Sequence, residues 1–294
     1  MKKESLFKKI LKFFAPMLTW VPDSLYVRVW YFYRTRKWLN LKNPKRFNDK
    51  MNWLKLYYKN PLFSKFADKY EVRDYVTNVI GEEYLIPMIG VWDTFDEIDF
   101  STFPEQFVLK CTHDSGSVII CKDKKTFDFE SAKKKLTQKL GENYFIWSRE
   151  WVYKNIKPRI IVEEYLSEIS EDRLRDYKFY CFHGKAKLVV VNYDRATNVK
   201  GNTYTMDWEY VPVELSFPSD PNKVISRPQT LDKMKELVEK LSADCCFMRV
   251  DMYSVDDVIY FGEMSFTPRS GGYNISPDAF NFELGSWLTL PEKM

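Results

Sequence analysis

The stretch CCFMRVDMYSVDDVIYFGEMSF, residues 245–266, is apolar enough for two buried strands, yet three charges interrupt it at Arg249, Asp251 and Glu263. Side chains alternate between the two faces of a strand, so Arg249 and Asp251 share a face. Glu263 joins that face if the loop between the strands has an odd length, three or five residues. Opposed like charges repel, and an unpaired buried charge is costly. Two interpretations follow: a solvated face with Arg249 paired to a carboxylate, or oxygen ligands for a divalent cation such as Mg²⁺.

The composition is that of a globular protein large enough for two or three subdomains. The chain has 294 residues, of which 45% are hydrophobic and 29% are charged. Its five cysteines show no CxxC spacing, so we expect neither a zinc site nor a disulfide framework. This cysteine usage indicates a protein of the reducing cytosol. The presence of only two histidines argues against a histidine-based metal site.

The positive charge of the chain is concentrated at its start. Residues 1–46 carry twelve Lys and Arg against Glu4 and Asp23, a balance of +10, so a net charge of +4 leaves −6 for the remainder. Residues 2–14 combine helical apolar spacing with a lysine-rich face. This pattern predicts a basic amphipathic segment over residues 1–42 that contacts an anionic membrane surface or docks on the protein itself. The apolar run is too interrupted for a membrane span, and no signal-peptide pattern is present.

The order of elements predicts an α+β fold with antiparallel sheets. The sequence predicts mixed helices followed by a short strand over residues 43–105, and the pattern changes to one rich in strands at Phe107. From there we expect a strand at 107–112, a loop at 113–117, a strand at 118–122, a helix at 129–141, a strand within 158–168, a hairpin at 176–194 turning at 183–185, a helix at 232–243 and the hairpin quoted above.

Several polar residues interrupt these apolar strands. Lys110 lies within FVLKC, and a lysine in a central strand either extends to solvent or meets an anion. The small residues of the following loop can present backbone N–H groups to a phosphate, although the loop is not a P-loop. Lys178 shares a strand face with Asp176, and Glu163 ends another strand. Each signal is weak when taken alone.

Taken in order, these features resemble the ATP-grasp fold, and more closely the TupA-like family associated with teichuronopeptide biosynthesis. The resemblance extends from about residue 43 to the C-terminus. It rests on the segments NPKRFNDKMNWLKLY, FADKYEVRDYV, IGEEYLIPMIGVWDTFDEIDF, FVLKCTHDSGSVIICKDK, REWVYKNIKPRIIVEEYL, DYKFYCFHGKAKLV, FMRVDMY and IYFGEMSFTPRSG.

The resemblance implies two antiparallel-sheet subdomains that sandwich a nucleotide, preceded by a helical N-terminal region. The implied division is an N-terminal segment at 1–42, a region at 43–105, a small lid subdomain at 106–160 and a large subdomain at 161–294.

The resemblance also assigns roles to residues. Arg249 and Lys178 would be catalytic, with Arg249 steadying the transferred phosphoryl group. The residues implied to bind ATP are Lys110, Ser115, Gly116, Ser117, Lys122, Glu163, Glu164, Tyr165, Leu166, Asp176 and Lys178. Those implied to bind Mg²⁺ are Asp251, Glu263 and Ser265, where Ser265 departs from the asparagine that many ATP-grasp enzymes place there.

The implied activity is an ATP-dependent carboxylate–amine ligase of cell-surface polysaccharide biosynthesis. It would act through an acyl-phosphate and join an amino acid to a glycan containing uronic acid. We expect a cytoplasmic protein in peripheral contact with the membrane through residues 2–14, a small-molecule or lipid-linked glycan acceptor, and no nucleic-acid partner. Arg73, Arg195 and Arg269 could hold substrate carboxylates, with a structural role as the simpler interpretation.

Two alternatives remain open at the level of sequence. A glycosyltransferase of polysaccharide or capsule assembly would also suit a membrane-surface helix, but the chain has no Asp-x-Asp triplet for a nucleotide-sugar. A non-catalytic nucleotide-binding or scaffold protein would tolerate loss of the charged residues, and all of them are present.

Overall fold

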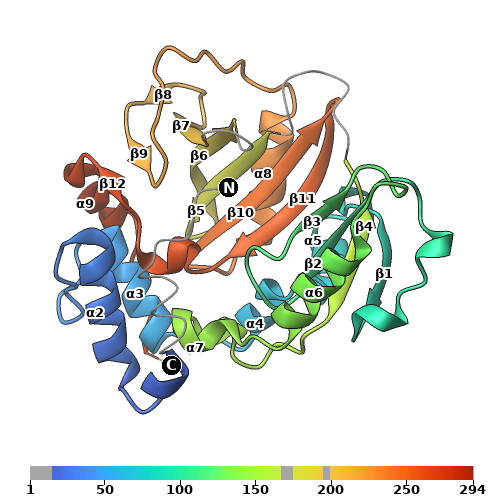
Figure 1. Ribbon diagram of the computed structural model, residues 1–294. Helices are drawn as coiled ribbons and strands as arrows, with labels where there is room; N and C mark the ends of the chain where they lie inside the picture. Colours follow the sequence, from blue (N-terminus) through green and yellow to red (C-terminus); the bar gives the residue numbers. More distant parts are fainter. Residues whose placement is uncertain (1–14, 167–174, 195–198, 294) are drawn as a thin grey trace.

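Two antiparallel sheets form the body of the protein, and a group of helices lies beside them in the computed structural model (Figure 1). The structure describes residues 15–166, 175–194 and 199–293. The predicted membrane-contacting segment at 2–14 and Arg195 lie outside these residues. No helix within the described part of the chain is long and apolar enough to cross a membrane.

The smaller sheet has four strands in the order β1-β4-β2-β3. These strands are β1 (Met88–Trp92), β2 (Phe107–Cys111), β3 (Ile119–Cys121) and β4 (Ile160–Glu164). One face buries Phe107, Leu109 and Val162 against Leu136 of helix α6 (Phe129–Leu140) in a core separate from that of the rest of the protein. Strands β1 and β4 thus join β2 and β3, although the expected division at 106 and 160 separates them. That division remains a proposal.

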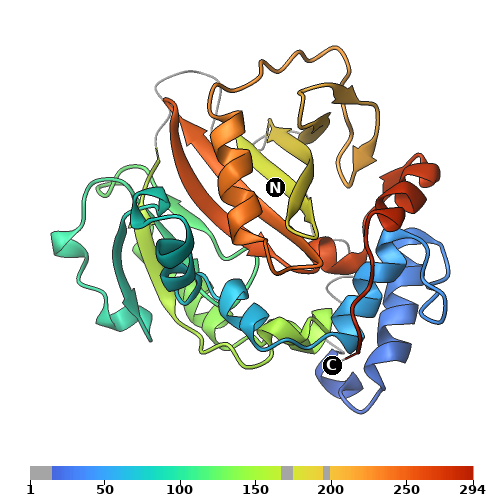
Figure 2. The same ribbon diagram turned by 180° about the vertical axis from the view of Figure 1, so that it is seen from behind.

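The larger sheet has six strands in the order β11-β10-β5-β6-β7-β8. Its strands are β5 (Asp176–Phe182), β6 (Lys185–Tyr193), β7 (Lys200–Thr205), β8 (Tyr210–Val211), β10 (Phe247–Val255) and β11 (Val258–Ser265). Helix α8 (Leu231–Leu241) covers one face, as Figure 2 shows from behind. Leu231, Met234, Leu237, Val238 and Leu241 recur at helical spacing and are all buried, which explains why this helix packs on the sheet.

The β10–β11 hairpin corrects the loop length expected from the sequence. The turn consists only of Asp256 and Asp257, both with positive φ, and not of three or five residues. Asp251 nevertheless lies directly opposite Glu263, because a β-bulge shifts the register between Asp251 and Met252. Gly262 supplies the extra residue, and a Cβ there would lie 3.0 Å from the Asp251 carbonyl oxygen. The odd residue that places both carboxylates on one face is therefore in the strand and not in the loop.

The remaining elements are mostly helical. They are the 3₁₀ helices η1 (Ala15–Leu18), η2 (Glu82–Tyr84), η3 (Phe95–Glu97), η4 (Phe100–Thr102), η5 (Trp151–Tyr153) and η6 (Pro268–Gly271), the helices α2 (Asp23–Thr35), α3 (Phe47–Tyr57), α4 (Leu62–Ala67), α5 (Val72–Val79), α7 (Tyr144–Ser148) and α9 (Asp278–Ser286), and the paired strands β9 (Glu214–Leu215) and β12 (Ile275–Ser276). The helical sequence between residues 61 and 81 is split into α4 and α5. Asp68 causes the break, since its carboxylate accepts hydrogen bonds from the backbone N–H groups of Tyr70 and Glu71.

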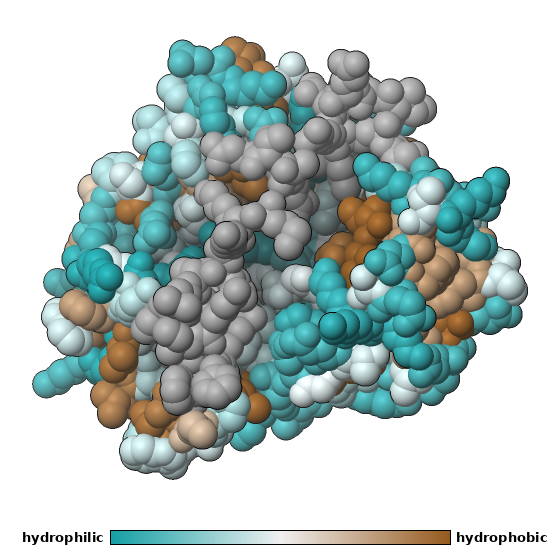
Figure 3. All heavy atoms as spheres, viewed as in Figure 1, coloured by the Kyte–Doolittle hydropathy of each residue, from teal (hydrophilic) through white to brown (hydrophobic). Residues whose placement is uncertain are grey.

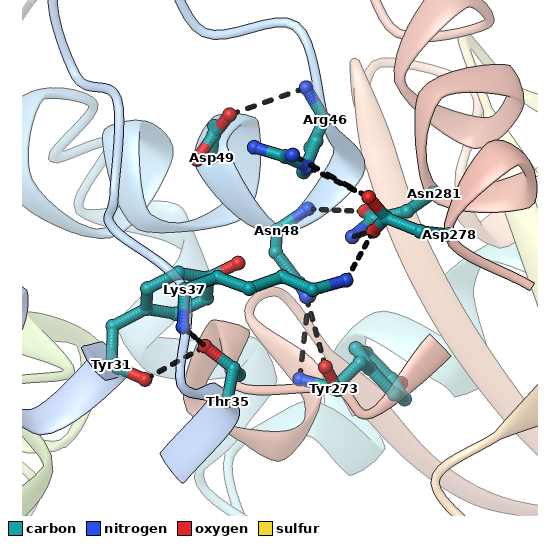
Figure 4. A network of polar contacts seen from close by, with 9 residues as sticks. All are labelled: Tyr31, Thr35, Lys37, Arg46, Asn48, Asp49, Tyr273, Asp278 and Asn281. Atoms are coloured by element: carbon teal, nitrogen blue, oxygen red, sulfur yellow. Dashed lines mark hydrogen bonds and ion pairs between the residues drawn. The ribbon is translucent and has the colours of Figure 1, made fainter. Parts of the chain in front are cut away.

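A polar network joins the N-terminal helices to the C-terminal segment (Figure 4). Asp278 of α9 pairs with Lys37 at 2.6 Å and with Arg46 at 3.4 Å. Asn48 of α3 donates to the carbonyl oxygen of Tyr273 at 2.9 Å. The segment that follows β11, including α9, is thereby held against α3 and the connection between α2 and α3.

Candidate active site

A cavity of about 1160 Å³ lies beside the charged face of the larger sheet. Its wall includes residues of β5, β10 and β11, the loop between β2 and β3, helix α7 and helix α2. Of the residues predicted to be functional, Ser115, Gly116, Lys178, Arg249, Glu263 and Ser265 line it. The sheet register and the β2–β3 loop therefore bring together residues more than a hundred positions apart in the sequence.

Arg249 is the centre of the charged cluster. It is buried, and its guanidinium holds Asp251 through two contacts, Nε to Oδ1 at 2.6 Å and Nη2 to Oδ2 at 2.9 Å. The same Nη2 donates to a Glu263 carboxylate oxygen and, at 3.1 Å, to Ser265 Oγ. One guanidinium thus organises all three predicted metal ligands, which share a strand face because of the bulge at Gly262.

Lys178 completes this cluster from the neighbouring strand. It lies opposite Asp251 in the β5–β10 register and pairs with both Asp251 and Asp176, the latter at 2.7 Å. Burial opposes the charge of the Lys178 ammonium, but the two carboxylates outweigh it and raise its pKa. Lys178 is therefore a fixed positive charge at the wall of the cavity.

The two opposed carboxylates differ in their protonation behaviour. Burial raises the pKa of Asp251 to about 6, even though Arg249 and Lys178 favour its charged form. Burial would also raise the pKa of Glu263, but nearby cations, Arg249 first, outweigh it and lower the value to about 2. Glu263 is thus an ionised oxygen donor that faces the cavity.

The fit of this set to Mg²⁺ rests on its chemistry. Carboxylate and hydroxyl oxygens are the ligands Mg²⁺ accepts, and the ion commonly binds one or two carboxylates and completes its shell with water and substrate phosphates. Within the described ranges, no group of three or more His, Cys, Asp or Glu side chains is arranged to hold a metal ion. The residues fit an ion that a bound triphosphate shares, and Ser265 is the weakest donor.

On the smaller sheet, Lys110 and Glu163 form a second charged group. The Lys110 ammonium contacts Glu163 Oε2 at 2.5 Å, across the β2–β4 pairing. Arg73 of α5 reaches the other carboxylate oxygen at 3.2 Å and the carbonyl oxygen of Ile86 at 3.0 Å. These contacts give Arg73 a structural role. Lys110 lies on an interior strand of the sheet, and neither Lys110 nor Glu163 lines the cavity.

The β2–β3 loop is built from its own side chains. Ser117 is buried, accepts a hydrogen bond from the Cys111 N–H at 2.8 Å and donates to Asp114 Oδ1 at 2.6 Å. Ser117 therefore shapes the loop and does not face the cavity. Gly116 has a φ of +104° and open space where a Cβ would stand. Ser115 and Gly116 are the loop residues that line the cavity.

Other predicted nucleotide-binding residues lie outside the cavity wall. The Lys122 side chain is exposed, and Glu164 ends β4 with its N–H bonded to the carbonyl oxygen of Pro87 at 3.0 Å. Tyr165 and Leu166 follow at the end of the described segment and are half-buried. Their roles in nucleotide binding remain proposals.

Sequence reasoning missed three charged residues of this region. Lys69, between α4 and α5, donates to the carbonyl oxygens of Cys111 and Asp114 and so anchors the β2–β3 loop. Glu150 lines the cavity and accepts a hydrogen bond from Thr267 Oγ1 at 2.6 Å. Lys55 of α3 is 1% exposed and donates to Ser270 O at 2.9 Å. Only Lys55 had a sequence signal, because it falls on the apolar stripe of its helix with Phe47 and Met51.

Comparisons with known proteins identify a family for most of the chain. The family described as TupA-like ATPgrasp matches residues 49–289, which is more than half of the sequence. A search of curated proteins finds no significant match.

Several solved ligases are distantly similar. D-alanine–D-alanine ligase from Helicobacter pylori is 13% identical with a TM-score of 0.39, over 76% of this chain and 61% of that chain. The Bacillus anthracis enzyme in complex with ATP is 16% identical with a TM-score of 0.41, over 76% and 64%. L-amino acid ligase from Bacillus licheniformis is 15% identical with a TM-score of 0.43, over 70% and 44%. The chain spans less than two thirds of the length of each.

Proposed function

Because the chain belongs to the TupA-like ATP-grasp family, we propose that it is an ATP-dependent ligase that joins a carboxylate to an amine. In the proposed reaction the carboxylate attacks the γ-phosphorus of ATP, giving an acyl-phosphate and ADP. The amine then attacks the acyl carbon and loses a proton, and phosphate leaves as the amide forms. No other reactant is needed for the balance.

The observation that carries this proposal is the cluster of Lys178, Arg249 and Glu263 at the cavity wall, together with the buried Asp251, which pairs with Lys178 and Arg249. A sheet that gathers two cations and two carboxylates on one face suits a metal-bound triphosphate, which can pair with both signs of charge. A bound Mg²⁺ would neutralise phosphate charge, with Asp251, Glu263 and Ser265 as the protein ligands.

The chain's own residues would act mainly by positioning and by electrostatic stabilisation. Lys178 and Lys110 would hold phosphate oxygens from the two sheets, and Arg249 would steady the transferred phosphoryl group. The backbone of Ser115 and Gly116 would cover the phosphates. Asp176, Ser117 and Lys69 would act indirectly, because each orients a neighbour: Asp176 pairs with Lys178, Ser117 shapes the loop and Lys69 anchors it.

The substrates proposed are an amino acid and a glycan that contains uronic acid, in the assembly of a cell-surface polysaccharide. This step rests on the family relationship alone. We further propose that the protein works in the cytoplasm at the membrane surface, where a lipid-linked acceptor would be found.

The exposed apolar side chains of η1, α2 and the turn between them support the membrane location. Met17, Trp20, Leu25 and Val29 are 65%, 80%, 53% and 58% exposed, and Figure 3 shows apolar surface over this part of the protein. The same region of sequence holds the excess of Lys and Arg. Exposed apolar and aromatic side chains beside basic ones are typical of a surface that lies on anionic lipid.

The decisive experiment is nucleotide binding measured by thermal shift. Wild-type protein would be heated with ATP, ADP or a UDP-sugar, each with Mg²⁺, beside Lys178→Ala and the control Lys187→Ala, an exposed lysine of the next strand. ATP at a hundred times its dissociation constant should stabilise wild type and control by about 2.7 kcal/mol, and Lys178→Ala should lose this effect. A response to the UDP-sugar alone would overturn the ligase proposal and favour the glycosyltransferase.

A further inference from the structure

Two arginines from different parts of the chain, Arg34 of α2 and Arg269 of η6, line the same cavity as the charged cluster. The Arg34 side chain is fixed through its Nε, which donates to the carbonyl oxygen of Gly272 at 3.3 Å. The Arg269 guanidinium lies 4.8 Å from the ring centroid of Phe217. Desolvation by the surrounding protein, and then the charge of Arg269, lower the pKa of Arg34, so the two cations are within electrostatic range.

Neither arginine has an acidic partner within residues 15–166, 175–194 and 199–293. Other arginines of the described chain do form ion pairs, among them Arg46, Arg73, Arg149, Arg159, Arg227 and Arg249. Among the described residues, neither the Nη groups of Arg34 nor the Arg269 guanidinium donates a hydrogen bond, so these donors are available to a ligand in the cavity. Two neighbouring like charges without a counter-ion repel, and a bound anion would relieve this repulsion.

The backbone at Arg269 is held in an unusual conformation. Arg269 and Ser270 have φ values of 56° and 55°, a left-handed region that residues other than glycine seldom adopt. The buried Lys55 ammonium fixes this segment by donating to Ser270 O at 2.9 Å and to Ser270 Oγ at 3.2 Å. The segment is thus supported from behind while Arg269 remains exposed at the cavity.

We propose that Arg34 and Arg269 together bind a phosphate or diphosphate group of the second substrate, at a site separate from the triphosphate site. This rests on the proposed ligase function for the identity of the second substrate. Two guanidinium forks match the charge and the several acceptor oxygens of a phosphate better than those of a carboxylate, which one arginine can satisfy. Trp30 and Tyr33 also line the cavity and offer an apolar flank for the group that carries the phosphate.

The site has a consequence for specificity. Arg34 lies outside residues 49–289, the part that matches the family, whereas Arg269 lies inside it. Helix α2 would therefore supply half of the phosphate site, and acceptor recognition would depend on the N-terminal region.

Isothermal titration tests the proposal. The nucleotide site would first be filled with the non-hydrolysable analogue AMP-PNP and Mg²⁺, and inorganic phosphate or acetate would then be titrated into wild type, Arg34→Gln, Arg269→Gln and Arg36→Gln. Arg36 is the matched control, since it is an exposed arginine beyond the end of the same helix. We expect phosphate to bind wild type and Arg36→Gln equally, and either cavity variant to weaken it at least tenfold. AMP-PNP affinity should be unchanged in all four.

Farnesyl diphosphate in detergent provides the lipid-linked arm. Binding tighter than that of free phosphate, and dependent on Arg34, would assign the site to a lipid-linked diphosphate, whereas equal binding would assign it to a soluble phosphate ester. Preference for acetate, or phosphate binding that survives both cavity substitutions, would overturn the proposal. Arg34-dependent phosphate binding without any AMP-PNP binding would keep the anion site and remove the ligase function, so the two failures are distinguishable.

Discussion

Lys55 is a buried cation in α3, a helix that also buries the polar side chains of Asn48, Asp49 and Asn52. Its ammonium is hydrogen-bonded to Ser148 and Ser270 and lies 5.0 Å from the ring centroid of Trp30. Burial lowers its pKa from 10.5 to about 8, although Glu150 favours the charged form. The charged form of Lys55 therefore lowers the stability of the folded state, while its hydrogen bonds support the backbone beside Arg269.

The first prediction concerns the pH dependence of stability that Lys55 causes. The unfolded chain keeps the Lys55 proton up to about pH 10.5, whereas the folded protein releases it near pH 8. The unfolded state binds more protons between these values, so this group makes the folded state more stable as pH rises. The unfolding free energy of wild type relative to Lys55→Met should rise by up to about 3 kcal/mol across that window, at 1.36 kcal/mol for each pH unit.

Urea unfolding of both proteins from pH 7.5 to 10.5 measures this difference. The exposed Lys187→Met is the control and should give a difference from wild type that is flat over the same range. A flat difference for Lys55→Met as well would show that Lys55 keeps its ordinary pKa when folded.

Some site residues could be found from the sequence and others could not, for physical reasons. Arg249, Asp251 and Lys178 stand within apolar strands, and the alternation of a strand fixes which face each occupies. Lys69 and Glu150 lie in irregular segments, where no periodicity predicts direction or burial. Their places depend on how the two sheets and the helices pack, which local pattern does not encode.

At the scale of elements, the alternation of side chains in the β10–β11 hairpin predicted which residues share a face but not where the extra residue lies. Alternation required one extra residue between Asp251 and Glu263, and that requirement was correct. The extra residue lies at Gly262, because a glycine in a strand can accommodate the close approach of the Asp251 backbone. A β-bulge in the strand and a loop of odd length both place Asp251 and Glu263 on the same face of the sheet. The sequence pattern alone therefore could not show which of the two is present.

The second prediction is made for the turn of this hairpin. Asp256 and Asp257 both have positive φ, at 49° and 62°, as two-residue turns between strands require. Glycine has no Cβ and adopts positive φ without strain, so Asp257→Gly should stabilise the protein by about 0.5 kcal/mol. The larger conformational entropy of glycine in the unfolded chain offsets part of the strain energy that is removed. Asp257→Ala should destabilise it by roughly 1 kcal/mol, because alanine disfavours this region. Chemical denaturation would measure both, and a less stable glycine variant would contradict the assigned turn.

At the scale of the whole molecule, the family match confirms the predicted ATP-grasp fold and its TupA-like character. The helical N-terminal region adds something that the matched part lacks. Helix α2 has Trp30 and Arg34 on the side that lines the cavity, while Leu25 and Val29 are exposed to solvent. On an ideal helix Arg34 lies opposite Leu25, whereas Val29 is one turn from Tyr33, which also lines the cavity. One helix would thus connect a membrane surface to the acceptor part of the cavity.

The last prediction tests that connection through membrane binding. Replacing Trp20 and Val29 with serine removes two exposed apolar side chains, each worth about 1.5–3 kcal/mol if fully buried in the lipid interface. Binding to vesicles that contain anionic lipid should fall by at least tenfold in a sedimentation assay, and wild-type binding should weaken as salt is raised. Val224→Ser is the control, because Val224 is 86% exposed and lies far from α2 in sequence. Equal loss of vesicle binding in the control, or wild-type binding that does not depend on anionic lipid, would mean that the apolar surface of residues 17–29 does not contact a membrane. The acceptor would then have to reach the cavity from solution.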